Sequence, residues 1–154
     1  MSIPIRSKPI NIIARNKKAR HEYEILDIFE AGISLLGTEV KSLRGGKATI
    51  KEAFVQMKGN EAFLIRANIQ PYTHASHENH EATRHRKLLL NPQELKKLRE
   101  GVREKGLSIV PLSLYFKGAW VKVEIALARG RKIHDKRQNL KQKQDKRDMQ
   151  RRLR

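Results

Sequence analysis

The sequence predicts a mainly β protein, a small closed barrel of about six antiparallel strands with two flanking helices and a basic C-terminal tail. Short segments of alternating apolar and polar residues recur along the chain, tight turns join them, and a glycine interrupts the first of them. Antiparallel strands that are joined by short turns and begin with a bent strand are typical of an OB-like barrel, which is the architecture we predict.

The positive charge is concentrated at the two ends of the chain. The formal net charge is +18, and residues 1–20 contribute six bases and no acid, while residues 129–154 contribute twelve bases and three acids. The intervening residues carry sixteen bases and thirteen acids, so the body is close to neutral. A neutral body with cationic ends is typical of a protein that binds a polyanion, and we expect nucleic acid rather than ends that only add solubility.

Composition excludes several classes of protein. The 154 residues suit one domain, and the absence of cysteine excludes a disulfide framework and a thiolate zinc site. Residues 1–11 lack the apolar region of a signal peptide, and no apolar run is long enough to cross a bilayer. We therefore expect a cytoplasmic protein with no membrane partner.

Three regions are expected. Residues 1–13 mix prolines with scattered apolar residues and predict a flexible basic lead-in. Residues 14–129 are expected to form the barrel. Residues 130–154 are highly charged and have too few apolar residues for a helix that stands alone, so this tail is expected to be disordered when free.

The first strand is expected before a bend at Ala31–Gly32. Apolar residues on both of its faces predict coverage on both sides, with Tyr23, Ile25 and Phe29 on one face and Leu26 and Ile28 on the other. A short helix follows, for which Thr38 is the expected cap and Gly45–Gly46 the stop. Its spacing predicts an apolar face of Leu36, Val40 and Leu43 opposite Lys41, Ser42 and Arg44.

A hairpin is expected next, turning at residues 58–61. Val55 and Met57 mark its first strand, and the return strand consists of Phe63, Ile65, Ala67 and Ile69. Residues 70–83 lack periodicity and predict a long surface loop, which ends in the basic run at residues 84–87.

A second helix and two strands complete the predicted barrel. Asn91, Pro92 and Glu94 form a helix start of the capping-box type, and Gly106 ends this helix. The strand that follows contains Pro111, which requires an edge position or a bulge. The last strand alternates clearly, with Val121, Val123, Ile125 and Leu127 inward and Lys122, Glu124 and Ala126 outward.

No catalytic or metal site is expected. His74, His77 and His80 recur at every third residue, but without cysteine or a matched fourth ligand they are expected to face solvent or RNA. The chain has no nucleophile elbow, phosphate-binding glycine loop or paired-carboxylate constellation. We therefore expect a binding protein that is not an enzyme and has no cofactor.

The aromatic content indicates which kind of nucleic acid is bound. Only 5% of the residues are aromatic, too few for a protein that binds single strands by serial stacking. A folded RNA that is recognised by its shape and backbone fits better, with Tyr72, Tyr115 and Trp120 left for local stacking.

Glu30 and Lys122 each have two possible roles. Glu30 is either an ion-pair partner of Arg44 or Lys47, or an acceptor for a base amino group or an aligner of the arginines that read a base. Lys122 projects outward from its strand and is either a solvated charge or a phosphate contact. The residues alone leave both questions open.

Several blocks in one order resemble the small protein B (SmpB) family, the partners of transfer-messenger RNA in trans-translation. The blocks are NKKARHEYEI, FEAGISLLGTEVKSLRGGKA, RKLLLN, VPLSLYFKGAWVKVEIALARGRKIHDKR and the basic tail, and together they cover about residues 16–154. One departure is Ala82–Thr83 before Arg84, where many members have a proline.

The resemblance implies a function and site residues. It implies an OB-like barrel that binds the tRNA-like domain of transfer-messenger RNA and delivers it to stalled ribosomes, with elongation factor Tu on the aminoacylated RNA. The RNA-binding residues that it implies, with the basic residues near them, are Asn16, Lys17, Lys18, Glu30, Lys41, Arg44, Lys47, Leu89 and Lys122.

The resemblance also assigns a role to the tail, which is expected to enter the empty mRNA channel of the small subunit, become helical and reach the decoding centre of the ribosomal RNA. The matching tail residues are Gly130, Arg131, Lys132, His134, Asp135, Lys136 and Arg137. The alternative is a general ribosomal or RNA-binding OB protein whose basic ends bind without specificity.

Overall fold

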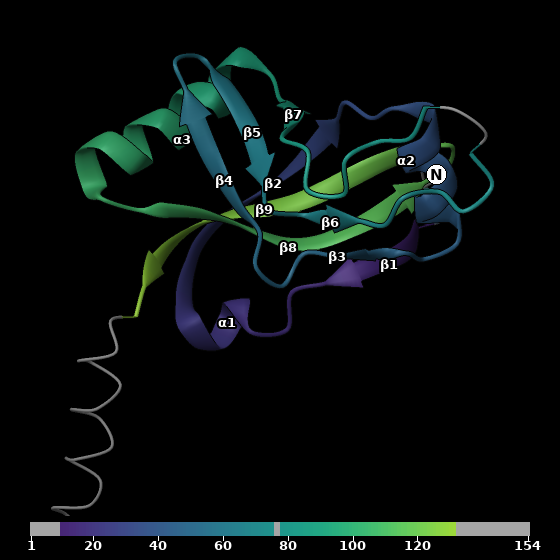
Figure 1. Cartoon of the computed structure of the whole chain (residues 1–154). Coiled ribbons are helices and arrows are strands. Elements are labelled where there is room, and N and C mark those ends of the chain that lie inside the picture. The colour runs from purple at the N-terminus through teal and green to yellow at the C-terminus, as the bar shows by residue number, and fades with distance from the viewer. Residues whose placement is uncertain (1–9, 76–77, 132–154) are drawn as a thin grey trace, which may run out of the picture.

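The structure, a computed structural model, describes residues 10–75 and 78–131 (Figure 1). None of the helices in these ranges is both long and apolar enough to cross a membrane. The elements in chain order are β1 (Ile10–Arg15), α1 (Ala19–Glu22), β2 (Tyr23–Ile33), α2 (Gly37–Arg44), β3 (Ala48–Thr49), β4 (Phe54–Lys58), β5 (Glu61–Ile65), β6 (Asn68–Ile69), β7 (Arg86–Leu89), α3 (Pro92–Lys105), β8 (Ser108–Lys117) and β9 (Trp120–Gly130).

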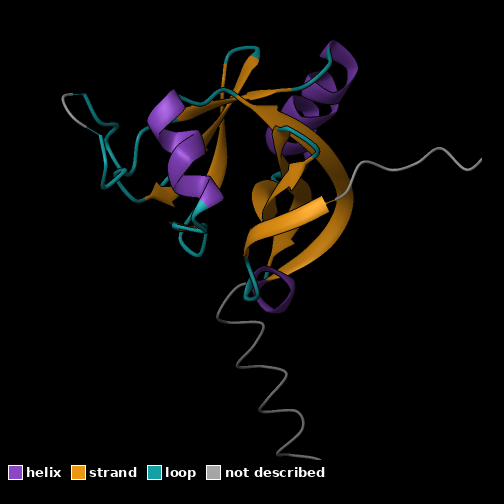
Figure 2. Ribbon diagram, turned by 90° about the vertical axis from the view of Figure 1, so that its right-hand side faces the viewer, coloured by secondary structure: helices purple, strands orange, loops and turns teal. Residues whose placement is uncertain are grey.

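Six of the strands close into a ring, so the prediction of a mainly β fold is confirmed. The order around the ring is β8-β4-β5-β7-β2-β9, and β9 pairs with β8 to close it. Every pairing in the ring is antiparallel. Figure 2 shows the strands wrapped around one core, with the helices at separate edges.

The core fills the inside of this ring. Val123 and Ile125 of β9 are fully buried, and Val121 and Leu127 are nearly so, as their alternation predicts. Leu98 of α3 packs into the same cluster.

A smaller cluster lies on the other side of β8 and β9, where α1 packs against the sheet. It consists of Ala19, Val110, Leu112, Ala126 and Ala128, all buried. Ala126 was expected to face outward, and it does leave the main core, but α1 covers it. The four-residue helix α1 therefore covers this smaller cluster, and the sequence pattern did not predict it.

Strand β1 corrects the expected extent of the lead-in. Residues 10–13 were placed in a flexible segment, but Ile10–Arg15 pairs with the C-terminal half of β8, from Ile10 opposite Lys117 to Arg15 opposite Ser113. The N-terminal half of the same β8 edge pairs with β4 at Ile109. β1 thus extends the sheet along β8. It pairs with the part of the β8 edge that β4 leaves without a partner.

Strand β2 is irregular at a different residue from the one expected. The register with β9 shifts between Ile25 and Asp27, so the bulge lies around Leu26 rather than at Gly32. Leu26 and Ile28 are 45% and 46% exposed, so the prediction that both faces are covered is wrong. Gly32 instead allows a close approach, because a Cβ there would lie 3.2 Å from Cβ of Leu89 in β7.

The hairpin β4–β5 forms as predicted, but its return strand ends at Ile65, and Phe63 does not join the core. Val55 pairs with Leu64, and Ala62 and Leu64 are fully buried, while Phe63 is only partly buried. Phe63 lies instead beneath the Lys58 ammonium, which is 5.2 Å from the ring centroid. The other three residues expected in the return strand, Ile65, Ala67 and Ile69, are buried.

The predicted start and end of helix α3 and the predicted bulge in strand β8 are confirmed. Asn91 Oδ1 accepts from the Glu94 N–H at 2.8 Å, and Glu94 returns a bond to the Asn91 N–H at 3.2 Å. Gly106 adopts the left-handed conformation, with φ of 63°. Pro111 lies beside a register shift, which is the bulge that its missing N–H requires.

Helix α2 begins two residues earlier than expected, and one of its residues takes part in a buried ion pair. Its N-cap is Leu36, whose N–H donates to the Glu39 carboxylate at 2.8 Å. Glu39 is fully buried and is bound by Arg86, also fully buried, and by Arg84 at 2.5 Å. Burial raises the pKa of Glu39, but hydrogen bonds from Arg84, Leu36 and Arg86 outweigh it and hold the pKa below its usual value.

Thr38 holds the loop instead of capping the helix. Its hydroxyl lies 2.9 Å from Nδ1 of His80, and Nε2 of the same ring lies 2.8 Å from the Ile69 carbonyl. Because a carbonyl only accepts, Nε2 carries the proton and Nδ1 accepts from Thr38. His80 is 5% exposed, so the expectation that it faces solvent or RNA is wrong.

Candidate nucleic-acid interface

Strand register gathers several expected site residues on one face of the sheet, which we call the outer face. It consists of side chains that point away from the core in β1, β8, β9, β2 and β7. Successive rows across these strands are Arg15, Ser113, Glu124 and Glu30, then Ile12, Tyr115, Lys122, Gly32 and Leu89, then Ile10, Lys117 and Trp120.

Glu30 occupies the middle of the outer face and is held by two donors. The Tyr115 hydroxyl donates to Oε2 at 2.5 Å, and the Lys117 ammonium lies 3.1 Å from Oε1. The ion-pair partner of Glu30 is thus Lys117, so the alternative that paired Glu30 with Arg44 or Lys47 is wrong. The sequence analysis did not name Lys117 as a partner, because its 87-residue separation from Glu30 left no local signal.

The electrostatics of this cluster keep the carboxylate ionised. The hydrogen bond from Tyr115, helped by Lys117 and the nearby Lys122, lowers the pKa of Glu30 in spite of its partial burial. Burial and the Glu30 charge raise the pKa of the Tyr115 hydroxyl well above its ordinary value. The phenol therefore remains a donor and the carboxylate an acceptor at neutral pH.

Lys122 and Leu89 flank Gly32 on its two sides. Gly32 pairs with Lys122 of β9 and with Leu89 of β7, so three strands meet there. Lys122 has no carboxylate within 4.0 Å among the described residues. Leu89 is 53% exposed and Trp120 66% exposed, so the outer face combines unpaired charge with apolar surface that a nucleobase can cover.

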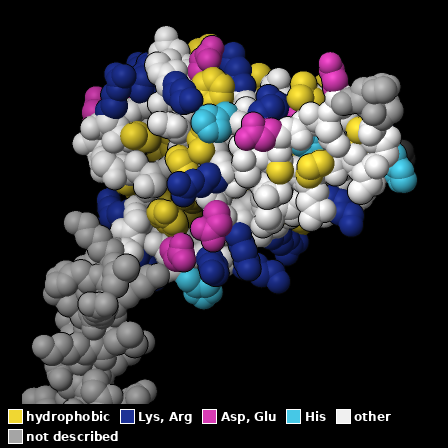
Figure 3. Space-filling view, in the orientation of Figure 1, with side chains coloured by type: hydrophobic (Ala, Val, Ile, Leu, Met, Phe, Trp, Pro, Cys, Tyr) yellow, Lys and Arg dark blue, Asp and Glu magenta, His cyan; other side chains and the backbone are white. Residues whose placement is uncertain are grey.

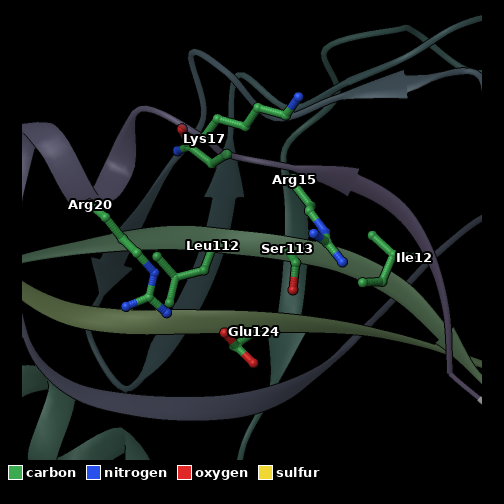
Figure 4. Close-up of a pocket in the computed structure, with 8 residues that line it drawn as sticks. Ile12, Arg15, Lys17, Arg20, Leu112, Ser113 and Glu124 are labelled. Carbon is green, nitrogen blue, oxygen red and sulfur yellow. The ribbon is translucent and has the colours of Figure 1, made fainter.

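A groove lies at the β1 end of the outer face (Figure 4). Its lining residues are Ile12, Arg15, Asn16, Lys17, Arg20, Leu112, Ser113 and Glu124. Figure 4 shows the Arg15 and Arg20 side chains extending over β8 toward Ser113 and Leu112, while the Lys17 amine points away. The sequence analysis named Asn16, Lys17 and Lys18 as site residues, and of these the groove contains Asn16 and Lys17.

The basic residues that were expected on and after α2 do not lie on the outer face. Lys41 and Arg44 are exposed on α2, and Lys47 follows it, in a part of the molecule remote from α1 (Figure 1). The Lys41 ammonium lies 5.6 Å from the Tyr72 ring centroid in the long loop. Figure 3 likewise shows Lys and Arg side chains dispersed over the visible face, with acids among them.

The histidine loop provides no metal site in the described part of the chain. No group of three or more His, Asp or Glu side chains there could hold an ion. His74 stacks edge-on against Tyr72 with centroids 5.5 Å apart, and His80 is committed to Thr38 and Ile69. His77 lies outside the described residues.

Comparisons with known proteins identify the family. The family model described as SmpB protein matches residues 13–154. The chain belongs to the SmpB family. Curated relatives of this SmpB-family chain include the SsrA-binding proteins of Microcystis aeruginosa, 53% identical over 92% of this chain and 93% of that one, and of Syntrophotalea carbinolica, 55% identical over 94% and 97%.

A solved structure agrees with this assignment to SmpB. A chain from the structure described as "tmRNA-SmpB: a journey to the center of the bacterial ribosome" matches with a TM-score of 0.64 and 47% identity. The match covers 77% of this chain and 84% of that one. The resemblance inferred from sequence blocks is therefore confirmed.

Of the residues expected to form the tail, the structure describes only Gly130 and Arg131. Gly130 pairs with Tyr23 as the last residue of β9, and the Arg131 N–H donates to the Glu22 carbonyl at 2.8 Å. These two residues, expected to open the tail, are therefore fixed to the sheet. The other expected tail residues, Lys132, His134, Asp135, Lys136 and Arg137, lie outside the described residues.

Proposed function

We propose that this protein binds the tRNA-like domain of transfer-messenger RNA through the outer face. Its family membership and its likeness to a chain of the transfer-messenger RNA–SmpB structure support this RNA as the partner. The observation that carries the proposal is the Glu30 carboxylate, ionised and held by Tyr115 and Lys117 beside the unpaired Lys122.

The chemistry of the outer face suits a folded RNA. A fixed carboxylate accepts from base amino groups or ribose hydroxyls, whereas an unpaired ammonium binds phosphate. Leu89 and Trp120 offer apolar surface for an unstacked base. Asn16 and Lys17 border the same face, and Lys18, exposed at the start of α1, follows them, while Lys41, Arg44 and Lys47 would meet a separate segment of a large RNA.

We further propose that the protein delivers this RNA to stalled ribosomes in the cytoplasm as an adaptor without catalytic activity. Elongation factor Tu would act through the aminoacylated RNA. The strand ring is proposed to be an OB-like barrel, in keeping with its antiparallel order and closure. The tail from residue 130, including His134 and Asp135, would occupy the mRNA channel and become helical there, its +8 charge favouring a phosphate-lined path.

Equilibrium binding to the tRNA-like fragment tests the RNA contact. Glu30→Gln removes the charge at nearly constant shape, and we expect at least about tenfold weaker binding with an unchanged fold, because a buried RNA donor then loses an ionic acceptor. The matched control is Glu61→Gln, another exposed acid paired with a lysine, at 3.2 Å from Lys87. Equal loss in both variants would show a general charge effect and contradict the proposal.

Truncation tests the division between body and tail. The cut belongs after Arg131, because Gly130 and Arg131 are bonded to the sheet and an earlier cut would damage β9. We expect the shortened protein to retain binding to the RNA fragment but to lose tagging of stalled ribosomes. Retention of a preference for tRNA-shaped RNA over bulk RNA at raised salt would separate this function from general RNA binding.

A further inference from the structure

The hairpin β4–β5 presents a second surface, on the side of its strands that points away from the core. Strand register places Phe54, Gln56 and Lys58 of β4 on this side, with Phe63 of β5 opposite Gln56. We call these four residues, together with Arg66, the hairpin face. Figure 1 shows the hairpin beside α3, on the opposite side of the molecule from α1.

Each aromatic ring of the hairpin face lies beneath a cation. The Arg66 guanidinium is 6.0 Å from the Phe54 ring centroid, and the Lys58 ammonium is 5.2 Å from the Phe63 ring centroid. Phe54 is 37% exposed, so a ligand can reach its ring. Neither cation has a carboxylate within 4.0 Å in the residues that the structure describes. An accessible ring beside an unpaired cation suits an unpaired nucleotide, because the ring stacks on the base and the cation binds the phosphate.

The backbone of Arg66 is strained. Its φ is 61°, and within residues 10–75 and 78–131 no other residue except glycine has a positive φ. Arg66 follows directly after β5, and this left-handed turn carries its guanidinium over Phe54 on the facing strand. A glycine would adopt the same conformation without strain, so this position sacrifices stability to hold an arginine there. Strain of this kind indicates a function for the side chain.

The two rings of the hairpin face are spaced for two neighbouring nucleotides. Phe63 lies opposite Gln56, and Phe54 is two residues away along β4, so the rings are diagonal neighbours, about 7–8 Å apart at the backbone. Two consecutive bases that are splayed apart can each cover one ring. Gln56 lies between the rings and is exposed, and its amide carries both donors and an acceptor for a base edge. An aromatic content of 5% excludes stacking along a long strand, but a segment this short needs only two rings.

Strand β7 connects the hairpin face with the outer face. Lys87 of β7 lies opposite Phe63, and Leu89, two residues further along, belongs to the outer face. The one acid beside the hairpin face, Glu61, lies opposite Lys58 in the register but pairs with Lys87, at 3.2 Å. A large RNA that is bound on the outer face can therefore extend an unpaired segment across β7 onto the hairpin.

We propose that the hairpin face binds a short single-stranded RNA segment, with one base stacked on Phe54 and the next on Phe63. Arg66 and Lys58 each move from the ring to the phosphate of the nucleotide that stacks there. This exchange is favourable, because a base stacked on an aromatic ring contributes more than an exposed cation–π contact. The inference goes beyond the proposed function, which concerns a folded RNA on the outer face, and it does not depend on that function.

NMR titration of the full-length protein with labelled phenylalanine rings tests the stacking. The chain has four phenylalanines, so the ring signals can be assigned individually. The probes are an oligouridylate of about six nucleotides, within the site size of small single-strand-binding domains, and a fully paired RNA duplex. We expect the single strand to shift the Phe54 and Phe63 rings but not the buried Phe29 ring, and the duplex to shift none of them. Unmoved Phe54 and Phe63 signals, or equal shifts with the duplex, would overturn the inference.

Phe54→Leu tests whether the ring itself is needed. Leucine keeps an apolar side chain at this exposed position, and we expect oligouridylate affinity to fall about fivefold or more because one stacked base is lost. Binding to the tRNA-like fragment should not change. Glu30→Gln is the converse control, because it should leave oligouridylate affinity unaltered. Equal loss of oligouridylate affinity in the two variants would show that a single surface binds both RNAs, and would contradict a separate site on the hairpin.

Arg66→Gly tests the strained cation in a variant that keeps the fold, because glycine accepts the left-handed backbone. We expect an unfolding midpoint at least as high as that of the unaltered protein. Oligouridylate affinity should nevertheless fall, with a salt dependence smaller by about one counterion, because one phosphate contact is removed. Arg103→Gln, at an exposed arginine in the last turn of α3, is the control and should change neither affinity nor salt dependence.

The two RNA probes separate this inference from the proposed function. If the unaltered protein binds oligouridylate through Phe54 and Phe63 but not the tRNA-like fragment, the proposed function fails and the site on the hairpin stands. If it binds the fragment and Arg66→Gly binds oligouridylate as Arg103→Gln does, the site on the hairpin alone fails.

Discussion

The Tyr115 hydroxyl of β8 donates a 2.5 Å hydrogen bond to Glu30 of β2, across the intervening strand β9. The two residues are 85 positions apart in the chain, and ring closure brings them together. The bond holds the carboxylate in one orientation and favours its ionised form. Tyr115 is thereby a positioning residue for Glu30.

Tyr115→Phe should weaken RNA binding without unfolding the protein. The ring still packs, but Glu30 loses its strongest hydrogen bond, so its pKa should rise toward the ordinary value and RNA affinity should fall about three- to tenfold. NMR titration of the Glu30 carboxyl and equilibrium binding measure the two effects. Tyr72→Phe, which lies by Lys41 on the other part of the molecule, should leave both unchanged.

Glu39→Gln should be strongly destabilising. The amide would leave the fully buried Arg86 guanidinium without its counter-charge, and removal of one partner from a buried pair costs about 3–5 kcal/mol. Urea unfolding measures the free energy. The exposed pair Lys87–Glu61 provides the comparison, because Glu61→Gln should cost at most about 1 kcal/mol. Equal costs would mean that the buried pair contributes no more than a surface pair.

The free energy of unfolding should fall in acid. The carboxyls of Glu30 and Glu39 have pKa values below 4.5 in the folded protein, so the unfolded state takes up their protons first. Their contribution is complete above pH 4.5 and is lost as the pH falls through the folded values. Urea unfolding from neutral pH to about pH 3 measures this loss. The Glu39→Gln variant should show a shallower decline, and a parallel decline would assign the effect to other groups.

Two glycines in helices should respond to alanine with opposite signs. A Cβ at Gly101 in α3 would lie 2.8 Å from Leu127 Cδ2, so Gly101→Ala should overpack the core and destabilise by about 1–3 kcal/mol. A Cβ at Gly37 in α2 meets nothing within 4 Å, so Gly37→Ala should stabilise by about 0.5–1 kcal/mol through helix propensity. Thermal unfolding of the pair distinguishes packing from propensity, and a gain in both would show that Leu127 yields freely.

Local sequence signals were sufficient to predict features whose partners lie within a single helix or strand. Asn91 and Glu94 cap α3 because the required partners lie three residues apart, and the alternation in β9 could place only one set of residues inside. The bulge at Pro111 followed from the missing N–H of proline. Such features need no knowledge of the remaining chain.

Long-range partners could not be predicted from the same patterns. Nothing in the local sequence marks Glu39 as half of a buried ion pair, because its partner Arg86 lies 47 residues later, in β7. Glu30 was selected as a site residue from the family resemblance, whereas its partner Lys117 was missed because strand register alone brings it within reach. Arg15 and Arg20 were counted only among the six bases of residues 1–20, since the groove that they line forms only when β1 pairs with β8.

The position of β1 has a consequence for motion. Within residues 10–75 and 78–131 this strand pairs only with β8, and the ring remains closed through six other strands if β1 detaches. Amide hydrogen exchange should therefore be faster in β1 than in β8 or β9, through local opening that costs less than global unfolding. Bound RNA would contact Arg15 and Asn16 at the end of this strand and so slow its exchange, which would make the N-terminal strand a clasp that tightens when the ligand arrives.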